Sequence, residues 1–313
     1  MALRTVPFGR ERKDLANLRS AIARGAPSAA VPLAEMRATF HRITAAMPLG
    51  DGIEHREGTV AGRPAEWTRI AASGAGDSRT DAAILHFHGG GYVIGSPVTT
   101  RSVTAGLARH TGLPVLAPDY RLAPEHPFPA AVDDALAVYC ELLDGGLSPG
   151  RVVVSGDSAG GGLAMALVLT LRDRHLSLPA GAVGISPLLD LTLSSPSIDA
   201  NRATDPQVTR EFLEVAVAHY LPAGADPKAP LASPVFADMS GFPPLLLQVG
   251  GDEALLDDSV RFGEAAETAG VDVTVECWEA MMHVWHSFAP RFPEGEAALA
   301  AVAAWIHDRL GRA

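Results

Sequence analysis

The sequence predicts an α/β fold in which helices flank a mostly parallel central sheet. From residue 83 onward, short apolar runs alternate with helix-like segments, the order that produces parallel strands joined by helices. Most of these runs are apolar throughout, as expected for strands that helices cover on both faces. The chain has 313 residues, of which 47% are hydrophobic, which is enough for one large core and a small appendage.

Six segments have the length and composition of strands. The first five are continuous apolar runs, whereas the last places Val271, Val273 and Val275 at alternating positions. That alternation indicates a strand near the edge of the sheet with one solvated face. A hairpin over residues 58–70, turning near Gly62, comes before them. The six predicted strands cover residues 83–87, 114–117, 152–155, 182–186, 245–249 and 271–277.

Helices are predicted where apolar residues recur at a spacing of three or four. Leu15, Leu18 and Ile22 show this spacing, and a second set follows between residues 36 and 43. We expect these N-terminal helices to come before any strand. Later helices are predicted over residues 130–143, 161–171, 259–269 and 297–310.

Composition and charge exclude several classes of partner. The formal net charge of -11 leaves no basic face for phosphates, so no nucleic-acid partner is expected. No apolar run approaches the roughly 20 residues that span a bilayer, so no membrane anchor is expected. Charges crowd the first 20 residues, which lack the apolar stretch of a secretory signal, and this predicts a cytoplasmic protein. Cys140 and Cys277 have no metal-ligand spacing and are predicted to be reduced thiols. Neither a cofactor nor a metal is expected.

Gly156-Asp157-Ser158-Ala159-Gly160 directly follows one predicted strand and opens a helix. A serine on such a tight turn is pushed into a cleft, and small residues two positions to either side are needed because chain segments pass too closely for a Cβ atom. The helix N-terminus behind it favours developing negative charge. Ser158 is therefore the candidate nucleophile, although the string alone also occurs in ordinary strand-to-helix turns.

His88-Gly89-Gly90-Gly91 stands at the end of the first long apolar strand. A glycine run there leaves backbone N–H groups free to point at a ligand. Donors at Gly90, Gly91 and Ala159 would each stabilise the charged oxygen of a tetrahedral intermediate by about 3 kcal/mol. The alternative is a phosphate-binding loop, but neither a following G-K-[ST] nor a G-x-G-x-x-G spacing is found at this point.

A serine nucleophile needs a base, usually a histidine held in the right tautomer by a carboxylate. His283 follows the last predicted strand, which gives the expected chain order of serine, acid and histidine. His286 is the alternative base. The acid is expected in the loop after residues 245–249, where any carboxylate could instead have a structural role at a helix N-terminus. The competing carboxylates are Asp252, Glu253, Asp257 and Asp258.

These motifs, in this order, resemble those of the hormone-sensitive-lipase-like esterases, which form bacterial family IV of the α/β-hydrolase superfamily. The resemblance covers the chain from about residue 32 onward and includes residues 119–130, which begin Asp119-Tyr120-Arg121. Residues 31–37 and 62–67 resemble the branch that contains monoterpene epsilon-lactone hydrolases and acetyl-hydrolases.

The resemblance implies an α/β-hydrolase fold with Ser158 as nucleophile, His283 as base, and Gly90, Gly91 and Ala159 as oxyanion donors. In that family the acid opens a pattern acidic-x-Leu-x-Asp. The pattern starting at Glu253 fits, whereas Asp252 misses it by one position. We therefore prefer Glu253, with Asp252 as the alternative, although the family usually has an aspartate.

The implied activity is hydrolysis of small-molecule carboxylic esters with short to medium acyl chains, through an acyl-enzyme intermediate. A lactonase or deacetylase using the same triad is the alternative, and a non-catalytic small-molecule binder is a further one. Residues 1–50 are expected to form an N-terminal helical cap segment, and residues 51–313 the catalytic domain, with a helical cap insertion at about 191–232. Because many relatives pair through the last strand, a homodimer is expected.

Overall fold

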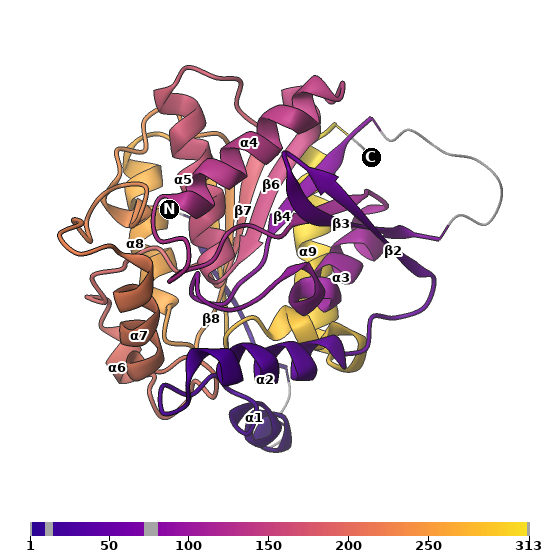
Figure 1. Ribbon diagram of the computed structural model, residues 1–313. Helices are drawn as coiled ribbons and strands as arrows, with labels where there is room; N and C mark the ends of the chain where they lie inside the picture. Colours follow the sequence, from indigo (N-terminus) through magenta and orange to yellow (C-terminus); the bar gives the residue numbers. More distant parts are fainter. Residues whose placement is uncertain (1, 10–14, 72–80, 312–313) are drawn as a thin grey trace.

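The prediction of a mostly parallel sheet flanked by helices is confirmed by the computed structural model, which describes residues 2–9, 15–71 and 81–311. The strands in this part of the chain are β1 Ala2–Val6, β2 Ile53–Val60, β3 Arg63–Ile70, β4 Ala83–Phe87, β5 Val115–Pro118, β6 Val152–Asp157, β7 Gly181–Ile185, β8 Leu245–Gly250 and β9 Val273–Trp278. They form one sheet in the order β1-β9-β8-β7-β6-β4-β5-β3-β2. Figure 1 labels β2, β3, β4, β6, β7 and β8 of this sheet. The pairings of β3 with β2 and β5 are antiparallel, and the others are parallel.

The six strands expected from apolar patterns are all present, with ends shifted by at most about two residues. Every residue of β4, β6, β7 and β8 is buried, as expected for strands covered on both faces. The hairpin starts at Ile53 rather than at residue 58. It turns through Ala61 and Gly62, whose positive φ angles of 51° and 71° suit a two-residue turn between twisted strands.

Strand β1 shows that the expectation of helices before any strand is wrong. It pairs in parallel with β9, Leu3 lying opposite Val275, so β9 is one strand in from the edge. Arg4 also contacts the carboxylate of Glu276 on β9 at 3.5 Å. These partners are 272 residues apart in the chain, and the short strand mixes polar and apolar residues, so no local pattern could reveal the pairing.

Helices cover both faces of the sheet (Figure 1). Helices α3 (Arg101–Thr111) and α9 (Pro293–Arg309) contribute to the apolar cluster on one face. Helices α4 (Ala130–Asp144), α5 (Ala159–Asp173) and α8 (Leu256–Thr268) pack on the other. All except α3 are among the predicted helices; α3 is made largely of small and polar residues, so its apolar spacing is weak.

Four further helices lie at one end of the sheet (Figure 1). Helices α1 (Ala16–Ala23) and α2 (Leu33–Ala45) come from the N-terminal segment, and α6 (Ser197–Ala200) and α7 (Arg210–Tyr220) from residues 191–232. None of the helices in the described ranges is both long enough and apolar enough to cross a bilayer.

The glycines on either side of Ser158 allow two backbones to approach each other. A Cβ atom on Gly160 would lie 2.0 Å from the carbonyl oxygen of Phe87, the last residue of β4. A Cβ atom on Gly156 would lie 2.1 Å from the carbonyl oxygen of Gly160. The turn between β6 and α5 is therefore pressed against the end of β4, where the glycine motif begins.

Replacing Gly160 with alanine should lower the free energy of unfolding by about 1–3 kcal/mol, because the added methyl group overpacks this contact. Gly150→Ala is the control, since a Cβ atom there meets nothing within 4 Å. Urea unfolding of the two variants measures the difference. Equal stabilities would contradict the close approach of the two backbones.

Candidate active site

Ser158 stands at the junction of β6, which ends at Asp157, and α5, which begins at Ala159. Its φ angle is 54°, in a region that costs a non-glycine residue about 1–3 kcal/mol. Two backbone hydrogen bonds hold the turn: Ser158 N donates to the carbonyl oxygen of Ile185, and Leu188 N donates to that of Ser158, both at 2.9 Å. The serine is thus fixed between the ends of two strands.

The glycine motif lies beside Ser158 at the end of β4. Gly90 and Gly91 have positive φ angles of 121° and 61°, which glycine tolerates. Helix α7 packs onto this loop, because a Cβ atom on Gly91 would lie only 2.9 Å from that of Ala216. Within the described part of the chain, the backbone N–H groups of Gly90, Gly91 and Ala159 have no hydrogen-bond acceptor. Unpaired N–H groups beside a serine suit a negatively charged oxygen.

His283 precedes the 3₁₀ helix η5 (Trp285–Arg291) and lines the same cavity as Ser158. Its Nδ1 atom is 3.4 Å from Oε1 of Glu253, which follows β8, and both side chains are buried. Burial lowers the pKa of His283, but the hydrogen bond and negative charge of Glu253 outweigh this and raise the pKa above its ordinary value. The arrangement can stabilise a histidine that takes up a proton.

A serine hydroxyl links the loop that carries Glu253 to the loop that carries His283. Ser186 Oγ donates to Oε2 of Glu253 at 2.7 Å and accepts from the N–H of Val284, next to His283, at 3.1 Å. The N–H of Gly250 donates to the same carboxylate oxygen at 2.8 Å. Burial raises the pKa of Glu253, while the hydrogen bonds from His283 and Ser186 oppose that rise. Sequence analysis missed Ser186, because it stands only as the last residue of a predicted strand.

Asp252, the alternative acid, has a different partner. Its Oδ2 atom accepts a hydrogen bond of 2.6 Å from Arg19 of α1. The carboxylate in hydrogen-bonding contact with His283 is that of Glu253. The geometry therefore favours Glu253 as the acid.

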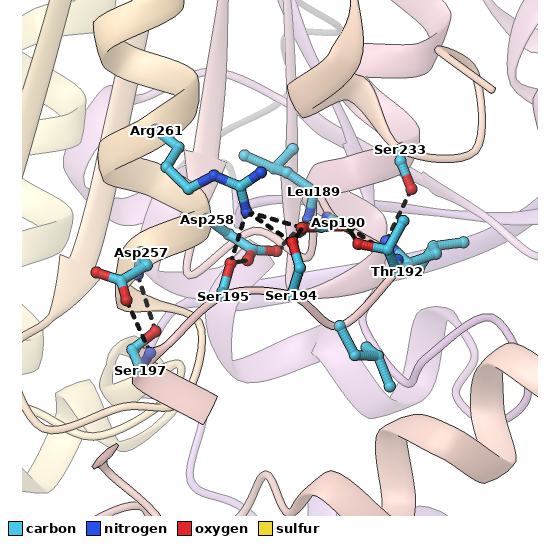
Figure 2. A network of polar contacts seen from close by, with 12 residues as sticks. Leu189, Asp190, Thr192, Ser194, Ser195, Ser197, Ser233, Asp257, Asp258 and Arg261 are labelled. Carbon is cyan, nitrogen blue, oxygen red and sulfur yellow. Dashed lines mark hydrogen bonds and ion pairs between the residues drawn. The ribbon is translucent and has the colours of Figure 1, made fainter. Parts of the chain in front are cut away.

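The remaining two carboxylates, Asp257 and Asp258, belong to a polar network between α8 and the loop after β7 (Figure 2). Asp258 is fully buried and accepts hydrogen bonds from the backbone N–H groups of Leu189 and Asp190, at 2.8 and 3.0 Å. Arg261 donates to Oδ2 of Asp190 at 2.7 Å. Burial raises the pKa of Asp258 to about 7. This network anchors the helix that follows the acid loop.

Two other histidines hold neighbouring groups in place. His286, the alternative base, lies in the core with its Nε2 atom 2.7 Å from Oε1 of Gln248, and burial lowers its pKa to about 3. His88 has its Nδ1 atom 2.9 Å from the carbonyl oxygen of Gly89, and burial lowers its pKa to about 4. Both rings are therefore neutral near pH 7.

A buried polar cluster behind Ser158 joins the ends of β4 and β6. Oδ1 of Asp157 accepts a hydrogen bond from Thr100 and lies 3.0 Å from Nε2 of His86. The other ring nitrogen of His86 is 2.8 Å from Oγ of Ser155. Burial would raise the pKa of Asp157, but the contacts with His86 and Thr100 outweigh it and lower the pKa.

Ser158, His283 and Gly90 line a cavity of about 80 Å³. A chamber of about 560 Å³ adjoins it, between α1, α2 and η5. Within the residues that the structure describes, no group of three or more histidine, cysteine, aspartate or glutamate side chains could hold a metal ion. The two spaces share a wall made of Pro27, Phe40, Thr44, Met47, Gln207 and Phe288.

Comparison with known proteins gives matches along most of the chain. A family model described as alpha/beta hydrolase fold matches residues 84–287. An acetyl-hydrolase of Streptomyces hygroscopicus is 44% identical over 265 residues, 85% of this chain and 85% of that protein. An esterase of Acinetobacter venetianus is 43% identical over 220 residues, 70% of this chain and 73% of that protein. A crystal structure of an esterase from the bacterial hormone-sensitive lipase family has a TM-score of 0.90 and 42% identity, covering 97% of this chain and 100% of that one.

Replacing Glu253 with glutamine should lower the pKa of His283, because burial then acts without the charge that opposes it. NMR titration of the imidazole measures this pKa. Asp252→Asn is the matched control and should shift the pKa much less. A larger shift in the Asp252 variant would identify Asp252 as the partner of the imidazole.

Proposed function

The chain belongs to the alpha/beta hydrolase family and is a carboxylic ester hydrolase, and we propose that it cleaves its esters through Ser158, His283 and Glu253. The observation that carries this proposal is the shared cavity. Ser158 and His283 line it together, and Glu253 contacts the Nδ1 atom of the imidazole, so that Nε2 is left for the serine.

The first half of the reaction transfers the acyl group to the enzyme. Ser158 Oγ attacks the ester carbonyl carbon while Nε2 of His283 accepts the hydroxyl proton. The carbonyl oxygen becomes negatively charged and accepts hydrogen bonds from the N–H groups of Gly90, Gly91 and Ala159. When the intermediate collapses, the bond to the alcohol oxygen breaks and His283 gives its proton to that oxygen.

The second half releases the acid. Water loses a proton to His283 and attacks the acyl carbon, and the proton then returns to Ser158 as the carboxylic acid departs. The negative charge of Glu253 stabilises the imidazolium that forms in each half, which agrees with the raised pKa of His283.

The two cavities support a substrate with one small and one bulky apolar part. The cavity of about 80 Å³ beside Ser158 suits a short group, whereas the chamber of about 560 Å³ is large enough for a medium-length chain or a small ring system. Apolar side chains make up much of the chamber wall, including Leu18, Ile22, Phe40 and Phe288. We therefore propose uncharged, small-molecule esters with short to medium acyl chains as substrates, held under a cap formed by α1, α2 and residues 191–232.

A deacetylase or lactonase using the same triad is the second candidate. The small cavity beside Ser158 and the relative named acetyl-hydrolase favour removal of acetyl groups. Rates on a panel of acetyl esters, longer acyl esters, lactones and acetamides separate these possibilities.

A cytoplasmic location and a homodimer are also proposed. Both cysteines are free thiols, which suits a reducing compartment. The outer edge of β9 is already paired with β1, so a dimer that continued the sheet on this side would have to pair through β1. With its formal net charge of -11, the chain is not proposed to bind nucleic acid.

Ser158→Ala should abolish labelling by a fluorophosphonate probe, and His283→Ala should slow it by about 10³-fold or more, because the hydroxyl then lacks its base. In-gel fluorescence of the wild type and the two variants measures the labelling. Persistent labelling of Ser158→Ala would place the nucleophile elsewhere.

Ala21→Trp should fill part of the chamber and lower kcat/KM for an octanoate ester about tenfold or more, while sparing the acetate ester. Ala23→Trp is the matched control, because Ala23 lies on the same helix and is not among the residues that line either cavity. Initial rates with p-nitrophenyl octanoate and acetate supply the comparison. Equal losses on both esters would show that the chamber does not select by size.

A further inference from the structure

We propose that Arg19, on helix α1, is a positioning residue that holds the loops carrying the base and the acid in register. The inference rests on the proposed roles of His283 and Glu253. The hydrolytic mechanism does not use Arg19. Its guanidinium group nevertheless donates hydrogen bonds to three different loops.

The three contacts of Arg19 are short and come from both terminal nitrogens. Nη1 donates to the carbonyl oxygen of Thr204 at 2.5 Å. Nη2 donates to Oδ2 of Asp252 at 2.6 Å and to the carbonyl oxygen of Ala280 at 2.8 Å. The side chain is 21% exposed, so these charge-assisted bonds are partly shielded from water. A planar guanidinium presents five N–H donors in a fixed fork, whereas an ammonium group presents three donors on a single nitrogen atom.

Two of the anchors lie in the loops that carry the proposed catalytic groups, a few residues before them at most. Asp252 immediately precedes Glu253, and Ala280 lies three residues before His283 in the loop after β9. Ala280 has a positive φ of 60°, a conformation that surrounding contacts must maintain. Arg19 therefore fixes the two loops at the points from which the acid and the base project.

The third anchor reaches the base through a glutamine. Thr204 lies three residues before Gln207, whose side-chain amide donates to the backbone carbonyl oxygen of His283. Thr204 Oγ1 also donates to the carbonyl oxygen of Asp252 at 3.0 Å. The loops that carry Thr204, Glu253 and His283 thus meet at the guanidinium group of Arg19.

The packing of α1 explains why the anchor lies on this helix. Leu15 and Ile22 join the apolar cluster that contains Trp278 and Met281, so the helix rests on the base loop. Ile22 and Leu18 also line the chamber. The same short helix therefore forms the chamber wall and holds the loops that carry the acid and the base.

Arg19→Met should lower kcat for p-nitrophenyl acetate by about 10- to 100-fold, because small misplacements of catalytic groups are costly. KM should change less than about threefold, since this small ester does not need the chamber. Arg19→Lys should recover part of the loss, because lysine keeps the charge and can still reach Asp252.

Arg151→Met is the matched control. Arg151 also pairs with one carboxylate and two backbone carbonyls, those of Asp81 and Leu310, and its side chain is 27% exposed. It lies just before β6, at the opposite end of that strand from Ser158. Both methionine variants should lose thermal stability, and only Arg19→Met should lose kcat.

Wild-type kcat in Arg19→Met, or an equal loss in Arg151→Met, would overturn the positioning role. If Arg19→Met does not fold, Arg19→Gln carries the same test, because glutamine also lacks the charge and the guanidinium fork, and wild-type kcat in that variant would overturn the role. Ser158→Ala, measured alongside, separates this outcome from a failure of the proposed triad. An active Ser158→Ala variant refutes the proposed triad. An inactive Ser158→Ala variant together with a fully active Arg19→Met variant refutes only the positioning role of Arg19.

Discussion

The close approach of the turn around Ser158 to the end of β4 is the constraint on which the site depends. The backbones at Gly160 and Phe87 are so near that no Cβ atom fits between them. That contact brings the serine next to the unpaired N–H groups of the glycine motif, which follows a different strand, β4. The buried cluster of His86, Asp157 and Thr100 satisfies the polar groups that the contact encloses. A serine raised on a strained turn is therefore stable here because its surroundings leave it no alternative position.

A second requirement is a charge balance around His283. Burial alone would keep His283 neutral and would favour protonation of Glu253. Each group offsets the desolvation of the other, and Ser186 supplies a further donor to the carboxylate. The glutamate is one methylene longer than the family's usual aspartate, and it reaches the imidazole from the position at which the family pattern begins. The neighbouring Asp252 is consequently available to pair with Arg19.

The sequence predicted those parts of the fold and site that local patterns encode. Apolar runs located the central strands, and the glycine spacing around Ser158 marked the turn because backbone proximity excludes larger residues there. Contacts between segments that are distant in the chain produce no such local pattern in the sequence. The pairing of β1 with β9 depends on few residues of mixed polarity, and Ser186 looks like any strand terminus until the loops of Glu253 and Val284 close around it. The choice between Glu253 and Asp252 likewise turned on a resemblance, since adjacent carboxylates are equivalent until side-chain direction is known.

The cap adds a constraint that neither the motif nor the triad imposes. Helix α1 lines the large chamber through Leu18 and Ile22, and through Arg19 it is tied to the acid and base loops. A displacement of the helix that enlarged the chamber would stretch the bonds to Asp252 and Ala280 at the same time. On the role proposed for Arg19, substrate range widens without loss of rate through changes in side-chain volume on the chamber wall, with the helix axis unmoved. The walls shared between the chamber and the small cavity beside Ser158 are the places where such changes act on both parts of the ester.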